Sequence, residues 1–323
     1  MKLFISNDKS TYKYIHDDLS ETSIKLLPGC SNQDRNKFTI FASMSYGCQY
    51  KCKFCYLTLK NIKYKKLSKE QVLNNLKEAL DKQLEETPEI KDKYIKLCWM
   101  GMGEDAFLNP DDMEWVTLNF LDYAMLFVKG LDGVDISSIV PKKIDIYIFN
   151  SLNEYLNKYP LNPANDIIVN IDKDTNRQKY KNRTPLRFFY SLYSFNDEVR
   201  KKLIPKALPV DDAIDLLSEL KTNIIFHTML IDGINDTNED VNLSIEMIKH
   251  ILNYGFLNFI ELRVLRLNTC ENSTLKESKK FNEMIDLFYK NDIPLKVQFS
   301  AGSEIKAACG QFLTDEYRDI NNQ

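Results

Sequence analysis

Hydrophobic residues recur along the chain in alternating strand-like and helix-like stretches from about residue 38 onward. Short apolar runs bounded by turn formers predict strands, and longer segments with an apolar residue every three or four positions predict helices. The expected strands are 38–43, 94–100, 144–149, 167–170, 188–192, 224–230, 259–265 and 295–299. The expected helices are 68–84, 113–128, 210–220, 238–252 and 278–290.

Repeated strand-then-helix units predict a parallel sheet with crossover helices, and six or more of them favour a partial (βα)6-type TIM barrel of the α/β class. Residues 1–37 are polar and end in turn formers, so we expect a short N-terminal extension followed by a barrel domain over 38–323. The charged segment 172–184 is expected to be an excursion that either covers the site or is mobile. At 323 residues, 44% of them hydrophobic, the chain can bury the core of such a domain.

Composition indicates a reducing, cytoplasmic setting. The seven cysteines do not form a secreted disulfide framework, and no apolar run approaches the ~18 residues of a membrane span. Met1–Ile5 is followed at once by polar residues, so we expect no signal peptide. The net charge of −3 argues against bulk electrostatic binding of nucleic acid, although 60–66 and 200–206 are locally basic. Either basic run is also typical of a solvated surface.

Three cysteines within eight residues, Cys48, Cys52 and Cys55, form the densest chemical cluster in the sequence. They follow the first expected strand, at the edge where barrel enzymes place their chemistry. Structural zinc usually needs four closed ligands, and no second cysteine pair follows. Iron-sulfur clusters normally take four thiolates, so three would leave one iron open to a ligand that is not protein. The spacing therefore favours an iron-sulfur cluster, with zinc as the alternative.

A second motif, Gly101–Met102–Gly103–Glu104, ends the strand expected at 94–100. Two glycines let the backbone approach a ligand closely, and the carboxylate lies at the carboxyl edge of the strand. A tight structural turn is the alternative interpretation.

The cysteine spacing, with Phe54 before the last cysteine, resembles the radical S-adenosylmethionine (SAM) superfamily. Further motifs are similar to those of the RlmN and Cfr family of radical SAM RNA methyltransferases, in the same order and from about Thr39 to Gln311. They are 100–104, 191–194 with the following Asn196, Asp197 and Arg200, 232–236, Asn268, and 307–311 with Gly302 before it.

This resemblance implies a 4Fe-4S cluster held by Cys48, Cys52 and Cys55, with SAM bound at the open iron. The implied cofactor-binding residues are Phe54, Gly101, Met102, Gly103, Glu104, Ser191 and Asn268, of which Glu104 would receive the SAM ammonium group. A lone cysteine in the position of Cys309 is ordinarily a small buried hydrophobe. In the family, the matching cysteine is first methylated by one SAM, and a radical made from a second SAM abstracts hydrogen from that methyl. The resulting carbon radical adds to an adenine ring carbon.

Two departures from the family pattern change the picture. The family has a second cysteine, which releases the methylated product, seven residues before the first cluster cysteine, where this chain has Phe41. Either Cys30, Cys98 or Cys270 substitutes, or a different group resolves the covalent adduct, or the reaction is not this methylation. Among the cysteines, Cys270, two residues past Asn268, is the first candidate. Residues 1–37 are also too few for the family's separate RNA-binding domain.

Three functions are therefore open. The first is radical SAM methylation of a nucleobase carbon, free or in RNA; the second is modification of a small metabolite or peptide by the same machinery. The third is a non-catalytic iron-sulfur redox or assembly protein, which would not need the SAM-binding motifs at Gly101–Glu104 and Asn268. We expect a monomer that takes electrons from a reductant such as flavodoxin or ferredoxin and has no membrane partner.

Overall fold

The structure of the chain, a computed structural model, describes a ten-stranded curved sheet, two small two-stranded sheets and the surrounding helices. The described residues are 1–26, 36–103, 105, 109–142, 146–163, 167–172, 177–181, 184–268, 273–298, 301–308 and 310–313, with backbone alone over 167–172 and 177–181.

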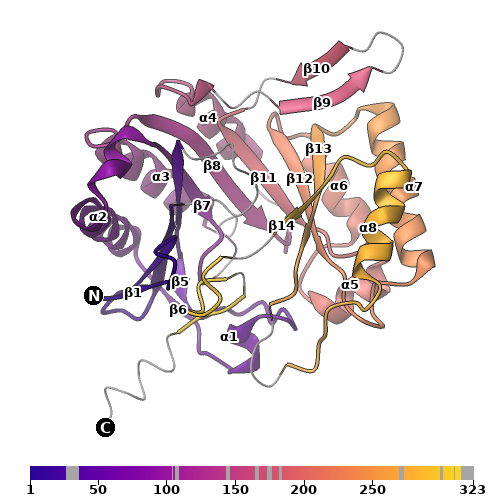
Figure 1. The fold of residues 1–323 in the computed structure, drawn as a ribbon, viewed down its shortest axis with the longest axis horizontal. Helices are drawn as coiled ribbons and strands as arrows, with labels where there is room; N and C mark the ends of the chain where they lie inside the picture. The colour runs from indigo at the N-terminus through magenta and orange to yellow at the C-terminus, as the bar shows by residue number, and fades with distance from the viewer. Residues whose placement is uncertain are drawn as a thin grey trace.

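Ten strands form the main sheet in the order β1-β2-β3-β4-β7-β8-β11-β12-β13-β14 (Figure 1). They are β1 (Lys2–Ile5), β2 (Thr11–Ile15), β3 (Glu21–Lys25), β4 (Lys37–Phe41), β7 (Tyr94–Trp99), β8 (Gly130–Ser138), β11 (Leu186–Ser191), β12 (Asn223–Met229), β13 (Phe259–Leu265) and β14 (Leu295–Gln298). From β4 to β14 every neighbouring pair is parallel. The predicted α/β class with a partial barrel is confirmed.

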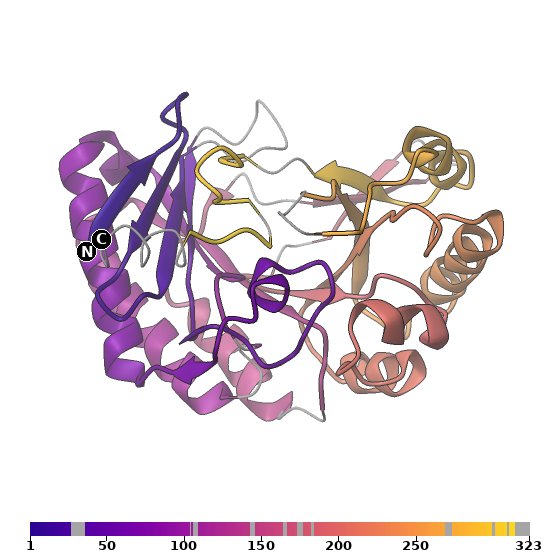
Figure 2. The same ribbon diagram turned by 90° about the horizontal axis from the view of Figure 1, so that it is seen from below.

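Helices cover the outer side of the curved sheet, as the view from below shows (Figure 2). They are α2 (Lys69–Glu86), the 3-10 turn η1 (Pro88–Asp92), α3 (Pro110–Ala124), α4 (Ile146–Leu156), α5 (Asp197–Leu203), α6 (Val210–Ser218), α7 (Asn238–Tyr254) and α8 (Phe281–Lys290). The short α1 (Tyr56–Leu59) lies with the small β5 (Ser45–Tyr46) and β6 (Lys65–Lys66) ladder near the carboxyl ends of the strands. None of the described helices is long and apolar enough to cross a lipid bilayer.

Local sequence explains where the longer helices begin and end. Ser68 caps α2 by accepting a hydrogen bond from the Gln71 N–H at 3.2 Å, and the Gln71 side chain accepts one from the Ser68 N–H at 2.9 Å. The apolar positions of α2, such as Val72, Leu76 and Leu80, are buried against the sheet. α7 ends where Gly255 adopts a left-handed φ of 64°, which suits glycine.

The strand expected at 144–149 is wrong, because this stretch enters helix α4 at Ile146. Phe149, Leu152 and Leu156 are buried at helical spacing. The apolar run 144–149 taken alone is too short for its pattern to distinguish a helix from a strand. The sheet takes β8 instead, from a glycine- and aspartate-containing stretch whose period-2 pattern is weak.

The strand expected at 167–170 exists as β9 (Ile167–Asp172), but it pairs with β10 (Arg177–Lys181) rather than with the main sheet. This hairpin occupies much of the segment expected to be an excursion. It lies at the opposite end of the barrel from α1 and β5 (Figure 1), so it does not cover the carboxyl ends of the strands.

Residues 1–26 form the antiparallel meander β1–β2–β3, which joins the main sheet through the pairing of β3 with β4. Residues 301–308 and 310–313 lie inside the curve of the sheet, between these strands and β14 (Figure 2). Thus the described part of the N-terminal extension is a continuation of the barrel sheet.

Candidate active site

A cavity of about 260 Å³ lies at the carboxyl ends of the parallel strands, the position typical of barrel active sites. It brings together most of the residues that the sequence singles out. Those lining it are Cys48, Cys52, Phe54, Cys55, Gly101, Met102, Gly103 and Ser191.

The cysteine loop, residues 47–55, is shaped by its backbone. Gly47 has a φ of 69°, and an added Cβ would collide with the Lys63 carbonyl, so glycine is required there. The Lys53 N–H donates to the Leu203 carbonyl at 2.9 Å, which ties the loop to the end of α5. The Tyr56 N–H, directly after Cys55, donates to the Gly310 carbonyl at 2.9 Å. The loop is therefore held by two distant segments.

All three thiols of the loop are half-buried and free of disulfides. The pKa of the Cys52 thiol is raised well above its usual value, mainly by burial and then by the neighbouring Cys55, Cys48 and Asp105. The thiols are thus close enough to repel one another as thiolates. Among the described residues, no group of three or more His, Cys, Asp or Glu side chains is arranged to hold a single metal ion.

The Gly101–Gly103 turn packs tightly over the loop that follows β4. Its Gly101 and Met102 N–H groups donate to the Ala42 carbonyl at 2.9 Å and to Ser43 Oγ at 2.8 Å. A Cβ on Gly101 would collide with that carbonyl and lie 2.6 Å from Ser43 Oγ. Small residues in this turn keep the cavity wall close to the backbone, which suits a site where a ligand contacts main-chain groups.

Aromatic and hydroxyl side chains complete the side of the cavity next to the loop. The rings of Phe54 and Tyr193 lie 4.8 Å apart, and Ser191 Oγ is 3.3 Å from Ser137 Oγ. Asp105 Oδ2 accepts a hydrogen bond from the Ile139 N–H at 2.9 Å. These contacts join the loop to the ends of β8 and β11.

The N-terminal strands hold the segment that closes the cavity. Lys13 and Glu21 form an ion pair with side chains about 2% exposed. Lys13 Nζ also donates to the Lys306 carbonyl, and the Leu313 N–H donates to Glu21 Oε1 at 2.7 Å. Lys25 Nζ donates to the Ala301 carbonyl at 3.0 Å. Strand β3 therefore holds Ala301 and Leu313, at the two ends of the closing segment, and β2 holds Lys306 between them.

Residues of this closing segment line the cavity: Ala307, Ala308, Gly310, Gln311 and Phe312. Cys309, Glu104 and Cys270 lie outside the described residues. Asn268 is described, but it does not line the cavity.

Phe41, at the position of the family's releasing cysteine, lines the cavity, and Lys25 Nζ lies 5.2 Å from its ring centroid. Cys98, one of the three substitutes considered for that cysteine, lies below the cavity without lining it. Its Sγ is 3.7 Å from Asp135 Oδ2, and burial raises the pKa of the thiol well above its usual value. Cys98 is therefore poorly suited to attack a bound ligand. Cys30 lies outside the described residues.

Sequence reasoning missed the polar interior of the barrel. Under the cavity, Asp135 pairs with Lys96 at 3.3 Å and with Arg187, and Asp132 lies 3.5 Å from Lys37. These oppositely charged groups hold the pKa values of both aspartates below their usual range despite burial. The sequence did contain a sign of this polar interior, because charged residues alternate with apolar ones within the strands and so point to one face of the sheet.

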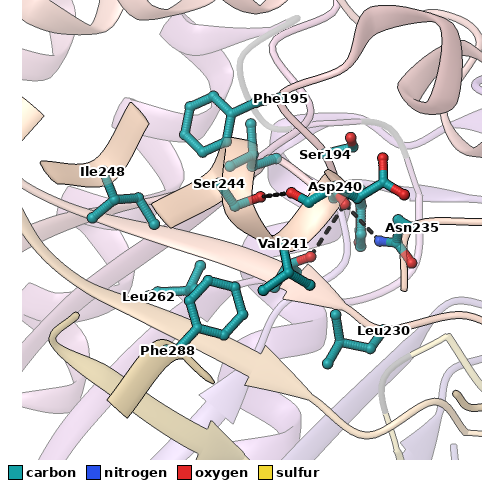
Figure 3. A pocket seen from close by; sticks show the side chains of 13 residues that line it. Ser194, Phe195, Leu230, Asn235, Asp240, Val241, Ser244, Ile248, Leu262 and Phe288 are labelled. Carbon is teal, nitrogen blue, oxygen red and sulfur yellow. Dashed lines mark hydrogen bonds between the residues drawn. The ribbon is translucent and has the colours of Figure 1, made fainter. Parts of the chain in front are cut away.

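His227 and Gln298 also line the cavity from the strand side, and sequence reasoning gave neither a role. A second cavity, of about 20 Å³, lies between the end of β12 and helices α7 and α8 (Figure 3). Its walls include Phe195, Leu230 and Phe288, and its volume suits about one water molecule. Ligand chemistry therefore belongs to the larger cavity.

Comparison with known proteins agrees with this geometry. No model of a known protein family matches the chain. It is 25% identical over 315 residues to a protein of Dictyoglomus turgidum named "Probable dual-specificity RNA methyltransferase RlmN", covering 95% of this chain and 77% of that protein. A protein of the same name from Clostridium novyi is 23% identical over 327 residues, covering 99% and 80%.

Among solved structures, a radical SAM methyltransferase from Sphaerobacter thermophilus has the same fold, with a TM-score of 0.67 at 18% identity, covering 97% of this chain and 80% of that one. The resemblance inferred from the motifs is thus confirmed by relatives that align along nearly the whole chain. The chain is thus similar to RlmN RNA methyltransferases along nearly its whole length and has the fold of a radical SAM methyltransferase.

Proposed function

We propose that this protein holds a 4Fe-4S cluster and SAM in the large cavity and transfers a methyl-derived carbon through Cys309 to a nucleobase carbon of RNA. One observation carries the proposal. The three-cysteine loop, the Gly101–Gly103 turn and both sequence neighbours of Cys309 line the same cavity.

The donor set fits a cluster better than a single ion. Each cluster thiolate binds a different iron, so three cysteines need not converge on one point. The raised pKa of Cys52 reflects burial and adjacent thiols, and bound iron would reverse this by stabilising the thiolate. Cys48, Cys52 and Cys55 would hold the cluster and leave one iron for SAM.

When bound, the cluster supplies the electron that cleaves SAM to a carbon radical, and SAM also supplies the methyl group. The protein supplies orientation and exclusion of water. The Gly101–Gly103 turn would bind the amino acid end of SAM, with Glu104 accepting a hydrogen bond from its ammonium group. The rings of Phe54 and Tyr193, which pack 4.8 Å apart, would exclude water from the same side.

Segment 301–313 would present the methyl carrier. The hydrogen bond from Tyr56 to Gly310 ties the residue after Cys309 to the residue after Cys55. A thiol that takes a methyl group and then offers it to a radical must be held within a few ångströms of both, and a clamped segment serves this need.

The names of the relatives and the charge near the cavity support RNA as the acceptor. Both curated relatives are named RNA methyltransferases. Lys60 and Lys306 lie over the Tyr56 ring, 5.8 and 5.9 Å from its centroid, so cations and an aromatic ring gather where a nucleotide could approach. A small metabolite or peptide is the alternative acceptor, because the cavity of about 260 Å³ can also take a small molecule.

The test is mass spectrometry of anaerobically reconstituted protein after incubation with SAM. We expect one added methyl group on Cys309, none in Cys309→Ala, and an unchanged modification in Cys98→Ala. RNA is then supplied as acceptor. A wild-type protein whose Cys309 stays unmethylated contradicts the methyl-carrier function, and transfer only to small molecules would favour the alternative acceptor.

Product release is proposed to depend on Cys270, because Phe41 cannot attack a thioether-linked adduct. Cys270→Ala should accumulate a covalent complex of enzyme and acceptor, detectable as a mass increase on the intact protein. Normal turnover by this variant would eliminate Cys270 as the releasing residue.

A further inference from the structure

His227 is a buried polar side chain of the cavity that the proposed mechanism does not use. It lies on β12, lines the cavity and is 7% exposed. Its Nε2 atom has no hydrogen-bond partner among the described residues. Leaving such an atom unpaired is costly, so its persistence in a ligand cavity points to a partner that arrives with the ligand.

The surroundings of His227 keep the imidazole neutral. Its ring packs 4.8 Å from the Phe189 ring, and the charges that act on it are those of Arg263, Asp135 and Glu261. Burial, followed by the Arg263 charge, lowers the pKa of His227 to about 3. A neutral imidazole has one N–H donor and one acceptor nitrogen, which suits an uncharged ligand group better than a phosphate or carboxylate.

Gln298, on the second strand from β12 in the sheet, also has a buried polar atom of this kind. Its Oε1 atom is buried and also has no partner in the described part of the chain. Gln298 lies on β14 opposite Leu265 of β13, and all three residues line the cavity. Within the described part of the chain, the strand side of the cavity therefore offers two unpaired polar atoms beside an apolar side chain.

We propose that His227 and Gln298 form a recognition pair for an uncharged planar edge of the methyl acceptor, with an amino group next to a ring nitrogen. The Gln298 oxygen accepts from the amino group, and the imidazole bonds to the ring nitrogen. This assignment rests on the proposed function and specifies how that site selects its acceptor. The same kind of edge occurs in the adenine of SAM, so the experiment must separate the two sources.

The test compares adenosine with inosine, in which a carbonyl replaces the amino group. Both are titrated calorimetrically into cluster-containing protein saturated with SAM. We expect the wild type to bind adenosine about tenfold more tightly, because the Gln298 oxygen faces an amino donor only in adenosine. Gln298→Met should abolish the preference for adenosine. His227→Phe should lower the affinity for both nucleosides several-fold.

Two controls make the outcome decisive. His227→Phe retains an aromatic ring against Phe189 and removes both ring nitrogens, while His250→Asn changes an exposed histidine of α7 and should leave the nucleoside affinities unchanged. Equal binding of adenosine and inosine by the wild type would overturn the proposal. So would variants that weaken SAM binding instead, because the pair would then read the adenine of SAM. The methylation of Cys309 is measured separately, so failure here is distinct from failure of the proposed function.

Discussion

The two sides of the large cavity are built in different ways. The side that holds Cys48, Cys52 and Cys55 consists of consecutive residues whose backbone is fixed by Gly47 and by hydrogen bonds to Leu203 and Gly310. The strand side consists of single side chains from β11 to β14 that are far apart in the sequence. In the proposed function, the compact motif supplies the chemistry of the site, and the dispersed strand residues select the ligand that it accepts.

Their electrostatics differ in the same sense. The cysteine side crowds thiols whose charged forms repel one another, an arrangement that a polycationic group would relieve. On the strand side, burial lowers the pKa of His227 and keeps its imidazole neutral. The neighbouring charges of Asp135 and Arg187 are paired with each other. One side is prepared for a charged cofactor and the other for an uncharged ligand group.

The largest expected effect breaks the cysteine side. Cys52→Ala should abolish both the brown colour of anaerobically purified protein and reductive cleavage of SAM, because two thiolates no longer hold a cluster with one open iron. Visible absorption and chromatographic detection of 5'-deoxyadenosine measure the two properties. Cys98→Ala, outside the cavity, is the matched control. A Cys52→Ala protein that kept its cluster and its cleavage activity would disprove the ligand assignment.

The next effect tests how the cavity is closed. Lys13→Met leaves Glu21 buried beside an apolar side chain, and breaking a buried pair in this way costs about 3 to 5 kcal/mol of unfolding free energy. Urea unfolding measures the loss, and hydrogen exchange should show weaker protection in 301–308. Lys82→Met, at the exposed pair with Glu85, should change neither reading. Unaltered exchange in 301–308 would mean that β2 does not clamp the closing segment.

The sequence predicts the cysteine side well because each of its motifs is contiguous. Strands β4 and β7 were expected within two residues of their ends, and the loops that follow them carry the motifs. By contrast, 144–149 was mistaken for a strand because a short apolar run has no decisive period. β1 to β3 went unrecognised because their mixed polar residues are buried by pairing and ion pairs rather than by an apolar face.

The strand side was not predictable from pattern alone. A single histidine or glutamine in an apolar strand has no spacing partner, and only the sheet order brings β12 and β14 to one cavity. Asn268 shows that a match to a family motif does not by itself place a residue in the cavity wall, because Asn268 does not line the cavity. Contact across strands is decided by topology, which no short motif encodes.

A smaller effect concerns the turn that joins the two sides. Glu104→Ala should retain the cluster but weaken SAM binding, because it removes a charge-assisted hydrogen bond worth about 1.5 to 3 kcal/mol. This corresponds to roughly tenfold to a hundredfold in affinity, measurable by calorimetric titration. Glu104→Gln should lose less, since the amide oxygen still accepts a hydrogen bond. Unchanged affinity for SAM in both variants would show that the Gly101–Gly103 turn has only a structural role.

The smallest effect sharpens the strand side through pH. The pKa of His227 is about 3 in the folded protein and near 6.5 when unfolded, so between these values the unfolded chain binds a proton that the folded protein does not. The unfolding free energy must therefore fall as pH drops from 7 toward 3.

The His227→Phe variant lacks this pH-dependent contribution. Relative to the wild type, its unfolding free energy should therefore rise by about 2 kcal/mol between pH 7 and pH 5. His16, whose pKa is also lowered by burial, is present in both proteins and cancels from the difference. Urea unfolding at the two pH values measures the gain, with His250→Asn as control. Parallel pH profiles for wild type and His227→Phe would show that the imidazole takes up its proton as readily in the folded protein as in the unfolded chain, so that the strand side does not disfavour charge.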